Sequence, residues 1–261
     1  MKITIIGAGA MGGAIAEGMA KKGMAKDGNL TVTALHQTTL DKFTPLGINT
    51  STENSSAIAK ADIIILAVKP WIAENVIEEI QDSMDYENQL LVSVVAGIPS
   101  ETMLLWLQKE GKVPNFWMAI PNTAIAECQS MTFIAPIHAK ETSTETISQL
   151  FSQLGQILVT DEKHLTAGTA LASCGIAYAM RYIRAATEGG VELGFKAKDA
   201  EKIVLQTLKG AVALLSSNDS HPEEEIDKVT TPGGMTIKGL NEMEHAGFTS
   251  AVIKGLKACL Q

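Results

Sequence analysis

The sequence has few cysteines and few aromatic residues, and it contains no long apolar run. Aromatic residues make up 5% of the 261 residues, and Cys128, Cys174 and Cys259 form no Cys-x-x-Cys pair. Such a scattered, odd-numbered set disfavours a disulfide framework or a structural zinc site and favours a reducing, cytoplasmic location. No apolar run approaches the roughly 20 residues that a membrane-spanning helix requires. We therefore expect a cytoplasmic protein with neither a metal site nor a membrane partner.

Basic residues are also in deficit. The chain has 21 lysines and arginines against 29 acidic residues, for a formal net charge of −8. This balance disfavours nucleic acid as a partner, because non-specific binding to the phosphate backbone needs a basic surface. Hydrophobic residues make up 46% of the chain, which is enough for a globular core in one large or two ordinary domains.

The first part of the chain alternates short apolar runs with helical patterns. Alternation of this kind predicts βαβ units and a mainly parallel, doubly wound sheet with helices on both faces. We therefore expect an α/β domain of the Rossmann type over residues 1–160. Its strands are predicted at Ile3–Ile6, Leu30–Leu35, Asp62–Val68, Gln89–Val95, Phe116–Ile120, Met131–Ala135 and Gln156–Thr160.

After Thr160 the pattern becomes helical, which predicts a second, all-α domain over residues 161–261. One long helix is expected from Asp161 through Ala186, with small and apolar residues almost all round. A domain of this size cannot readily bury such helices alone, so we expect them to pack against a second subunit. Packing against the first domain is the alternative. Further helices are predicted at Asp199–Leu215, Pro222–Val229, Thr236–Glu244 and Ala251–Leu260.

A glycine-rich motif lies between the first predicted strand and the first predicted helix. Gly7, Gly9 and Gly12 form a G-x-G-x-x-G motif that also contains Ala10 and Met11. The first glycine allows a tight turn, the second lets the backbone approach a pyrophosphate, and the third permits close helix–strand packing. The helix N-terminus that follows provides free N–H groups for the phosphates. This context predicts a dinucleotide site rather than a simple glycine turn.

The end of the second predicted strand indicates which dinucleotide binds. An NAD-selective site commonly has an acidic residue there, but residues 28–40 contain none and offer His36, Gln37, Thr38 and Thr39 instead. This uncharged loop predicts a preference for NADPH, with NADH possible. These residues could also cap the following helix, and both roles are compatible.

Two more predicted strands end in candidate cofactor loops. Ala67, Val68, Lys69 and Pro70 follow the strand that begins at Asp62, and ligands of open α/β sheets bind beyond such carboxyl ends. Lys69 could face the ligand or be a solvated loop lysine. The small residues Ala96 and Gly97 follow the next strand and would let a nicotinamide ring lie against the backbone.

The segment from Asp227 to Thr236 reads DKVTTPGGMT and places a Pro-Gly-Gly turn directly before a helix. Such a turn exposes amide N–H groups at a helix N-terminus, where a carboxylate binds readily. Thr230, Thr231 and Thr236 add hydroxyl groups. An ordinary turn with threonine caps is the alternative.

Several stretches along the chain resemble the pyrroline-5-carboxylate reductase family. They are GAGAMGGAIAEGM at residues 7–19, AVKP at 67–70, VSVVAGI at 92–98, PNT at 121–123, EGGVELG at 188–194 and DKVTTPGGMTIKGL at 227–240. The last run is the most specific. The chain departs from the family pattern at Met118, Ala124 and Ile176, where the family commonly has arginine, proline and proline.

The resemblance implies a Rossmann domain, a helical dimerisation domain and a homodimer or ring of dimers. It also implies NAD(P)H-dependent reduction of 1-pyrroline-5-carboxylate, an imino acid, to L-proline, the last step of proline biosynthesis. Thr236 falls on the threonine that hydrogen-bonds the substrate ring nitrogen. The substrate-binding loop would comprise Thr230, Thr231, Gly233, Gly234 and Met235, and Asn122 would join the cofactor-binding residues.

Two other functions stay open at this point. A β-hydroxy-acid reductase of related fold would need a catalytic lysine on the interdomain helix, where residues 177–186 offer only Arg181 and Arg184. A non-enzymatic nucleotide-binding regulator is the second alternative. Tyr178 lies in an apolar helix and is expected to pack in the core or an interface rather than act as an acid.

Overall fold

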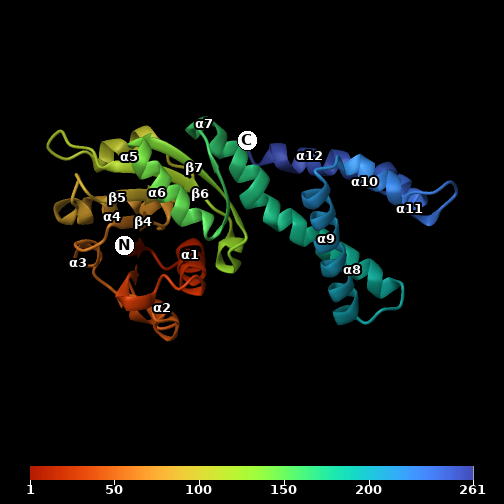
Figure 1. Cartoon of the computed structure of the whole chain (residues 1–261), viewed down its shortest axis with the longest axis horizontal. Helices are drawn as coiled ribbons and strands as arrows, with labels where there is room; N and C mark the ends of the chain where they lie inside the picture. Colours follow the sequence, from red (N-terminus) through yellow and green to blue (C-terminus); the bar gives the residue numbers. More distant parts are fainter. Residues whose placement is uncertain (261) are drawn as a thin grey trace. The chain divides into compact units, whose positions relative to one another are not determined.

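The computed structural model describes residues 1–260, and the chain divides into two compact units after Ser173. Figure 1 follows the order of the elements by colour, from strand β1 in red to helix α12 in blue. The first unit contains every strand of the described chain, and the second, from Cys174 onward, is helical. The α/β class and the all-α class predicted for the two parts of the chain are both confirmed.

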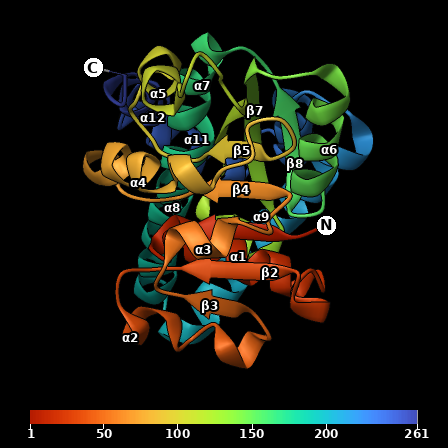
Figure 2. The same ribbon diagram turned by 90° about the vertical axis from the view of Figure 1, so that its left-hand side faces the viewer.

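The sheet of the first unit has eight strands in the order β3-β2-β1-β4-β5-β6-β7-β8. Pairing is parallel from β3 to β6, antiparallel between β6 and β7, and parallel again between β7 and β8. The strand directions rotate across the sheet, from the horizontal β2 to the steep β7 in Figure 2. The strands are β1 Ile3–Ile6, β2 Leu30–Thr33, β3 Asn49–Ser51, β4 Ile63–Leu66, β5 Leu90–Ser93, β6 Asn115–Ile120, β7 Ser130–His138 and β8 Gly155–Val159.

The two faces of the sheet carry separate hydrophobic cores, which explains the continuous apolar runs. In β4, Ile63 and Ile65 point to one core and Ile64 and Leu66 to the other, and all four are fully buried. A strand that is covered on both faces reads as an unbroken apolar run rather than an alternating one.

Helices cover both faces. α1 (Ala10–Lys21) and α6 (Glu141–Ser152) pack on the core that contains Ile63, while α3 (Asn54–Ile58), α4 (Ala73–Ile80), α5 (Ser100–Leu107) and α7 (Glu162–Gly168) pack on the other core. The short α2 (Gln37–Leu40) follows β2. Brief 3-10 turns occur at Lys26–Gly28, Thr44–Leu46, Pro70–Ile72, Gln81–Ser83 and Thr123–Glu127.

The predicted helix from Asp161 through Ala186 is confirmed as one continuous helical stretch, and the Asp161 side chain caps it by accepting from the His164 N–H at 3.0 Å. α7 ends at Gly168, a π-helical stretch follows at Thr169–Cys174, and α8 begins at Gly175. Tertiary contacts lie at both ends of the π-helical stretch. A Cβ on Gly168 would lie 2.8 Å from the ring of Phe133, and Ser173 Oγ donates to the Pro121 carbonyl at 2.9 Å. These contacts fix the backbone in a register that the local sequence pattern does not specify.

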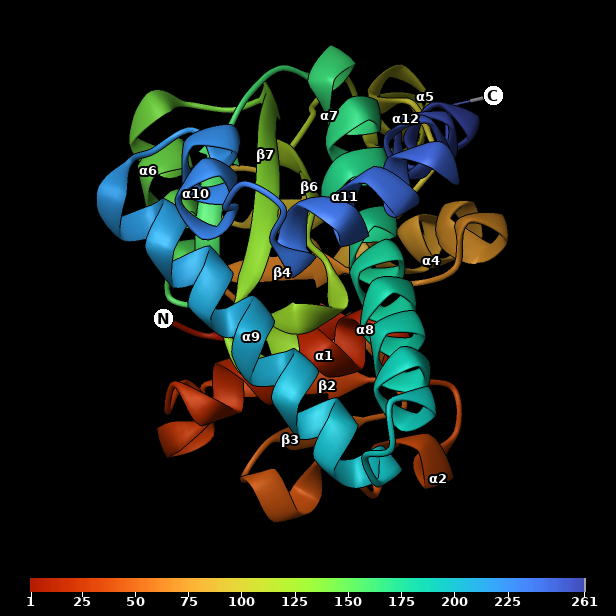
Figure 3. The same cartoon turned by 90° about the vertical axis from the view of Figure 1, so that its right-hand side faces the viewer.

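The second unit contains five helices among its described residues, and Figure 3 shows all five. α8 and α9 are joined by the short turn at residues 193–196 and pack against each other, with Ala200 beside Gly190. The helices are α8 Gly175–Glu192, α9 Ala197–Asn218, α10 Pro222–Val229, α11 Met235–His245 and α12 Phe248–Ala258.

This helical unit buries almost nothing within a single chain. Ala200 is its only buried residue between positions 174 and 260, so the expectation that the apolar α8 is buried does not hold within one subunit. Large apolar side chains are exposed instead, among them Met180 at 60%, Val212 at 63% and Phe195 at 52%. Apolar surface of this extent marks an interaction face. Within residues 1–260, no helix combines the length and the hydropathy that a bilayer span requires.

Candidate functional site

The glycine motif forms a tight turn between β1 and α1. Gly7 has φ +103°, a conformation that favours glycine, and its N–H donates to the Thr33 carbonyl at 3.1 Å. A Cβ on Gly12 would lie 1.9 Å from the Gly7 carbonyl oxygen, and a Cβ on Gly7 would lie 2.7 Å from that of Ala67. The turn therefore packs tightly against both α1 and the loop after β4, as the motif predicts for its first and third glycines.

The second glycine faces open space. No atom lies within 4 Å of a Cβ built on Gly9, which is the N-cap residue of α1 and makes no side-chain cap. The first turn of α1 has no acidic residue. Free amides at a helix N-terminus, with room in front of them, fit the pyrophosphate of a dinucleotide. Ala10 is exposed and Met11 half-buried at this same helix start.

The predicted ribose-binding end of β2 lies beside this turn. β2 ends at Thr33, two residues earlier than expected, and Thr33 Oγ1 donates to Asn54 Oδ1 at 2.5 Å. His36, Gln37 and Thr38 are all exposed at the start of α2. His36 is the N-cap residue but makes no side-chain cap, and Gln37 Nε2 donates to Asp41 Oδ1 at 3.2 Å. The capping role considered for His36 is therefore absent, and its imidazole points to solvent.

Lys69 follows β4 in an exposed loop. Its ammonium lies 5.8 Å from the centre of the Trp71 ring, in cation–π range. The loop begins beside the glycine turn, because the Ala67 N–H donates to the Ile6 carbonyl at 2.8 Å. Ala67 and Val68 are half-buried, and Val68 contacts the position that a Gly7 side chain would occupy. A cofactor contact by Lys69 stays a prediction.

The loops after β5 and β6 contain the remaining predicted cofactor residues. Ala96 and Gly97 are exposed, and Gly97 has φ +79°. Asn122 is only 6% exposed, and its side-chain amide forms hydrogen bonds with backbone groups of the first unit. Its Oδ1 accepts from the Ala124 N–H at 3.0 Å and its Nδ2 donates to the Ala172 carbonyl at 3.4 Å. Asn122 thus shapes this loop, and a contact with the cofactor stays a prediction.

The sequence patterns missed two exposed apolar side chains that also lie just beyond the carboxyl ends of the strands. Leu35, just after β2, is 82% exposed, and Trp71, just after β4, is 78% exposed. Large apolar groups held in solvent beside a ligand turn offer surface for a flat ring. No sequence signal distinguishes them, because Leu35 completes an apolar strand pattern.

In the helical unit, the Pro-Gly-Gly turn opens α11 as predicted. Gly233 has φ +72°, and the Gly234 N–H donates to the Thr231 carbonyl at 2.9 Å. Gly234 is the N-cap residue of α11 without a side-chain cap, and the first turn has no acidic residue. Met235 is 91% exposed and Thr236 is also exposed. Exposed amides and hydroxyls around a helix N-terminus fit a small carboxylate ligand.

Helix α10 anchors the approach to this turn. Glu225 accepts hydrogen bonds from Ser220 Oγ at 2.6 Å, Lys228 Nζ at 2.6 Å and Asn218 Nδ2 at 3.3 Å. These bonds lower the pKa of Glu225 from 4.5 to about 2, with Lys228 as the largest cause. The ionised carboxylate therefore joins the end of α9 to α10, immediately before Thr230.

We expect Glu225→Gln to change the acid unfolding of the helical unit. Since the pKa of Glu225 is lower in the folded chain, its contribution to stability is complete above about pH 4.5 and is lost as the pH falls towards about 2. The wild-type chain should therefore lose helicity over that window with a component that Glu225→Gln lacks. Circular dichroism during acid titration measures this difference. Glu224→Gln, in the same turn and without these bonds, is the control, and identical acid limbs in all three proteins would contradict the expectation.

Tyr178 is 38% exposed, so it is not in the core of a single chain, and its packing in an interface stays a prediction. Its hydroxyl donates to the Gly255 carbonyl at 3.2 Å and lies 2.7 Å from Cys259 Sγ, so it joins α8 to α12. The hydrogen bond with Cys259 and desolvation raise the pKa of Tyr178 to about 12. Such a phenol is a poor proton donor near neutral pH.

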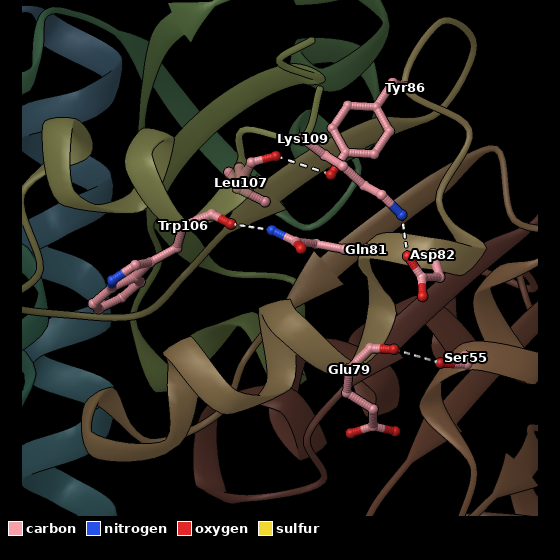
Figure 4. Close-up of polar contacts among 8 residues, drawn as sticks. All are labelled: Ser55, Glu79, Gln81, Asp82, Tyr86, Trp106, Leu107 and Lys109. Atoms are coloured by element: carbon pink, nitrogen blue, oxygen red, sulfur yellow. Dashed lines mark hydrogen bonds and ion pairs between the residues drawn. The ribbon is translucent and has the colours of Figure 1, made fainter. Parts of the chain in front are cut away.

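A polar cavity of about 290 Å³ is lined by residues that follow α4 and α5. Figure 4 shows the polar contacts among several of these residues. Lys109 pairs with Asp82, and the Tyr86 hydroxyl donates to the Leu107 carbonyl at 2.9 Å. Gln81 Nε2 donates to the Trp106 carbonyl. These contacts join the ends of the two helices. No group of three potential metal ligands occurs within residues 1–260.

Two family descriptions match two separate parts of the chain. Residues 2–97 match "NADP oxidoreductase coenzyme F420-dependent", and residues 162–261 match "Pyrroline-5-carboxylate reductase dimerisation". The first range contains the glycine turn and the loops after β2, β4 and β5. The second contains the α11 turn and the exposed apolar helices.

Similar proteins occur in several organisms. Pyrroline-5-carboxylate reductase 1 of Dictyostelium discoideum is 40% identical over 97% of this chain, which spans 48% of that relative's length. Pyrroline-5-carboxylate reductase 2 of the same organism is 38% identical and is covered over 89% of its length. The Arabidopsis thaliana pyrroline-5-carboxylate reductase is 32% identical and is covered over 92%.

Solved structures show the same fold. The pyrroline carboxylate reductase of Plasmodium falciparum, determined with NADP bound, has a TM-score of 0.88 at 27% identity, covering all of this chain and 95% of its own. The Coxiella burnetii pyrroline-5-carboxylate reductase has a TM-score of 0.87 at 26% identity, with 99% and 96% covered.

Proposed function

The chain belongs to the pyrroline-5-carboxylate reductase family, and on that basis we propose that it reduces 1-pyrroline-5-carboxylate to L-proline with NADPH. The observation that supports this most directly is the α11 turn, an exposed and uncapped helix start that follows Thr230 and Thr231, in a chain that also has an open glycine turn at α1. One turn fits a carboxylate and the other fits a dinucleotide.

In this reaction a hydride adds to the imine carbon, and the ring nitrogen gains a proton. The reduced nicotinamide supplies the hydride when it is bound. The turn formed by Thr230, Thr231, Gly233, Gly234 and Met235 holds the substrate carboxylate, while the Thr236 hydroxyl orients the ring nitrogen. Because an imine is readily protonated and then accepts hydride easily, the chain needs to supply orientation more than a strong acid.

The glycine turn of Gly7, Gly9, Ala10, Met11 and Gly12 holds the pyrophosphate in this proposal. The loops at residues 36–38, 67–70 and 96–97 and the Asn122 loop surround the rest of the cofactor. Residues 1–160 would bind the nucleotide, and residues 161–261 would provide dimerisation and substrate binding. A cytoplasmic location is part of the proposal and is supported by three free thiols.

The proposal is tested by following NADPH oxidation with purified chain and 1-pyrroline-5-carboxylate. We expect NADPH loss together with L-proline formation in equal amounts. Turnover of a β-hydroxy acid with NADP+, but not of the imine, would favour the related-fold reductase. Nucleotide binding without turnover of either substrate would favour a regulator.

The cofactor preference is tested separately. The absence of an acidic residue at positions 28–40, the NADP family match and the NADP-bound relative all support NADPH over NADH. We expect a higher kcat/KM with NADPH. Equal values for the two cofactors would contradict the preference.

The helical unit is a dimerisation domain, and a ring of dimers is a further proposal. An apolar cavity of about 500 Å³ between α8 and α12, lined by Tyr182, Phe248 and Val252 among others, supports the seating of a second copy. We expect sedimentation to give dimers or multiples of dimers. A compact monomer at assay concentrations would contradict both.

A further inference from the structure

The carboxylate of Glu162, the first residue of α7, contacts the first residue of α5. Glu162 Oε1 accepts from the backbone N–H of Ser100 at 2.7 Å, and Oε2 accepts from the Ser100 hydroxyl. The two residues are 62 positions apart in the sequence. Both Figure 2 and Figure 3 show α5 and α7 side by side at the same end of the first unit.

This contact caps a helix that has no cap of its own. The N-cap residue of α5 is Pro99, which makes no side-chain cap. The first N–H groups of a helix lack partners within the helix, and their end of the helix carries positive potential. A carboxylate that accepts two hydrogen bonds there is a strong, charge-assisted anchor. Ser100 is only 5% exposed, and Glu162 is half-buried.

The anchored helix start is also the end of a predicted cofactor loop. Residues 94–99 connect β5 to α5 and include Ala96 and Gly97. At the strand end, the Val94 N–H donates to the Leu66 carbonyl at 2.9 Å. At the helix end, Glu162 holds Ser100. Hydrogen bonds therefore hold both ends of this exposed loop, one at Val94 and one at Ser100, and Glu162 makes the bond at Ser100.

The other end of the same segment is tied to a second cofactor loop. Ser173 Oγ donates to the Pro121 carbonyl at 2.9 Å, and Asn122 Nδ2 donates to the Ala172 carbonyl at 3.4 Å. Residues 162–173 therefore fasten the loops after β5 and β6 to one continuous piece of chain. In a doubly wound sheet of this order, strands on the β5 side face the nicotinamide half of a dinucleotide, and those on the β2 side face the adenosine half.

We propose that Glu162 is a positioning residue that sets the β5–α5 loop against the nicotinamide half of the cofactor. This inference rests on the proposed reductase function. Glu162 acts through Ser100, so it affects the placement of the nicotinamide and not the chemistry of the imine. A contact that merely joined two helices would change stability without discriminating between the halves of the cofactor.

The test compares full cofactor with a fragment that lacks nicotinamide. Glu162→Ala should weaken NADP+ binding and lower kcat/KM by roughly tenfold, as expected for loss of a charge-assisted pair of hydrogen bonds. Binding of adenosine 2′,5′-bisphosphate should stay unchanged. Glu162→Gln keeps one acceptor for the Ser100 N–H and should recover most of the loss. Titration calorimetry of both ligands and steady-state kinetics give these values.

Glu101→Ala is the matched control, because Glu101 is an exposed acid in the same first turn of α5 and its side chain forms no hydrogen bond or ion pair among residues 1–260. It should behave as the wild type. Ser100→Ala removes only the hydroxyl contact and should have a smaller effect than Glu162→Ala.

Unchanged NADP+ binding in Glu162→Ala would overturn the proposal, and so would equal weakening of the cofactor and the fragment. If Glu162→Ala does not fold, Ser100→Ala decides by the same comparison: weaker NADP+ binding with the fragment unaffected supports the proposal, and unchanged NADP+ binding overturns it. If the wild type does not reduce 1-pyrroline-5-carboxylate, the proposed function fails, while the two binding measurements still decide the role of Glu162.

Discussion

Gly12→Ala should prevent the first unit from folding stably. The new Cβ would lie 1.9 Å from the Gly7 carbonyl oxygen and 3.1 Å from Ala67 Cβ. Since the first contact is with backbone, α1 would have to move away from the sheet, which disrupts the core around Ile15 and Met19. We expect a loss of about 3 kcal/mol or more in the free energy of unfolding, at or above the upper range for overpacked cores. Chemical denaturation of the purified variant measures it.

Gly9→Ala is the matched control, because it should leave stability unchanged but weaken NADPH binding. No atom lies within 4 Å of its Cβ position, and its backbone at φ −70° suits alanine. The variant should fold with wild-type stability. Its methyl group would occupy the space through which the backbone approaches the pyrophosphate, so NADPH affinity should fall by about tenfold or more. Normal NADPH binding by Gly9→Ala would show that the pyrophosphate lies elsewhere, and normal stability of Gly12→Ala would contradict the packing described for this turn.

Thr236→Ala should lower kcat by about 10- to 100-fold, because the substrate ring nitrogen would lose the hydroxyl that orients it for hydride transfer. The affinity for NADPH should not change, since the glycine turn is not affected. Stability should also be preserved, because Thr236 is exposed and its hydroxyl forms no hydrogen bond among residues 1–260. Steady-state kinetics with saturating NADPH and a cofactor titration measure the two effects.

Thr236→Ser is the control for this substitution. It keeps the hydroxyl and should keep most of the activity, whereas Thr236→Val keeps the shape without the hydroxyl and should resemble Thr236→Ala. Unchanged turnover in the alanine variant would remove Thr236 from the mechanism. Equal losses in the serine and alanine variants would indicate that the methyl group, rather than the hydroxyl, matters.

Strongly patterned elements were predictable because local and tertiary preferences agree in them. The runs Ile3–Ile6 and Ile63–Leu66 are buried on both faces, so their continuous apolar character marks strands directly. The Pro-Gly-Gly turn is similar, because glycine at φ +72° and a proline restrict the backbone locally.

The short edge strand β3 (Asn49–Ser51) was not predicted. It has three polar residues and forms only because Thr31, Val32 and Thr33 of β2 are available for pairing. Leu35 was expected to end β2, yet it lies in solvent, since the strand ends once its pairing partners end. Edge elements depend on neighbours in space, and the sequence pattern carries little information about them.

The sequence alone determined the fold class, the glycine turn before α1 and the Pro-Gly-Gly turn before α11, because each depends on backbone freedom or apolar periodicity within a few consecutive residues. Only the tertiary structure decided that the helix after Asp161 becomes π-helical over Thr169–Cys174, next to Gly168, where Phe133 leaves no room for a side chain. It also decided that Glu162 caps a helix that begins 62 residues earlier. Contacts between residues so far apart in the chain leave no periodic trace in the sequence, so they become apparent only when the sheet brings them together.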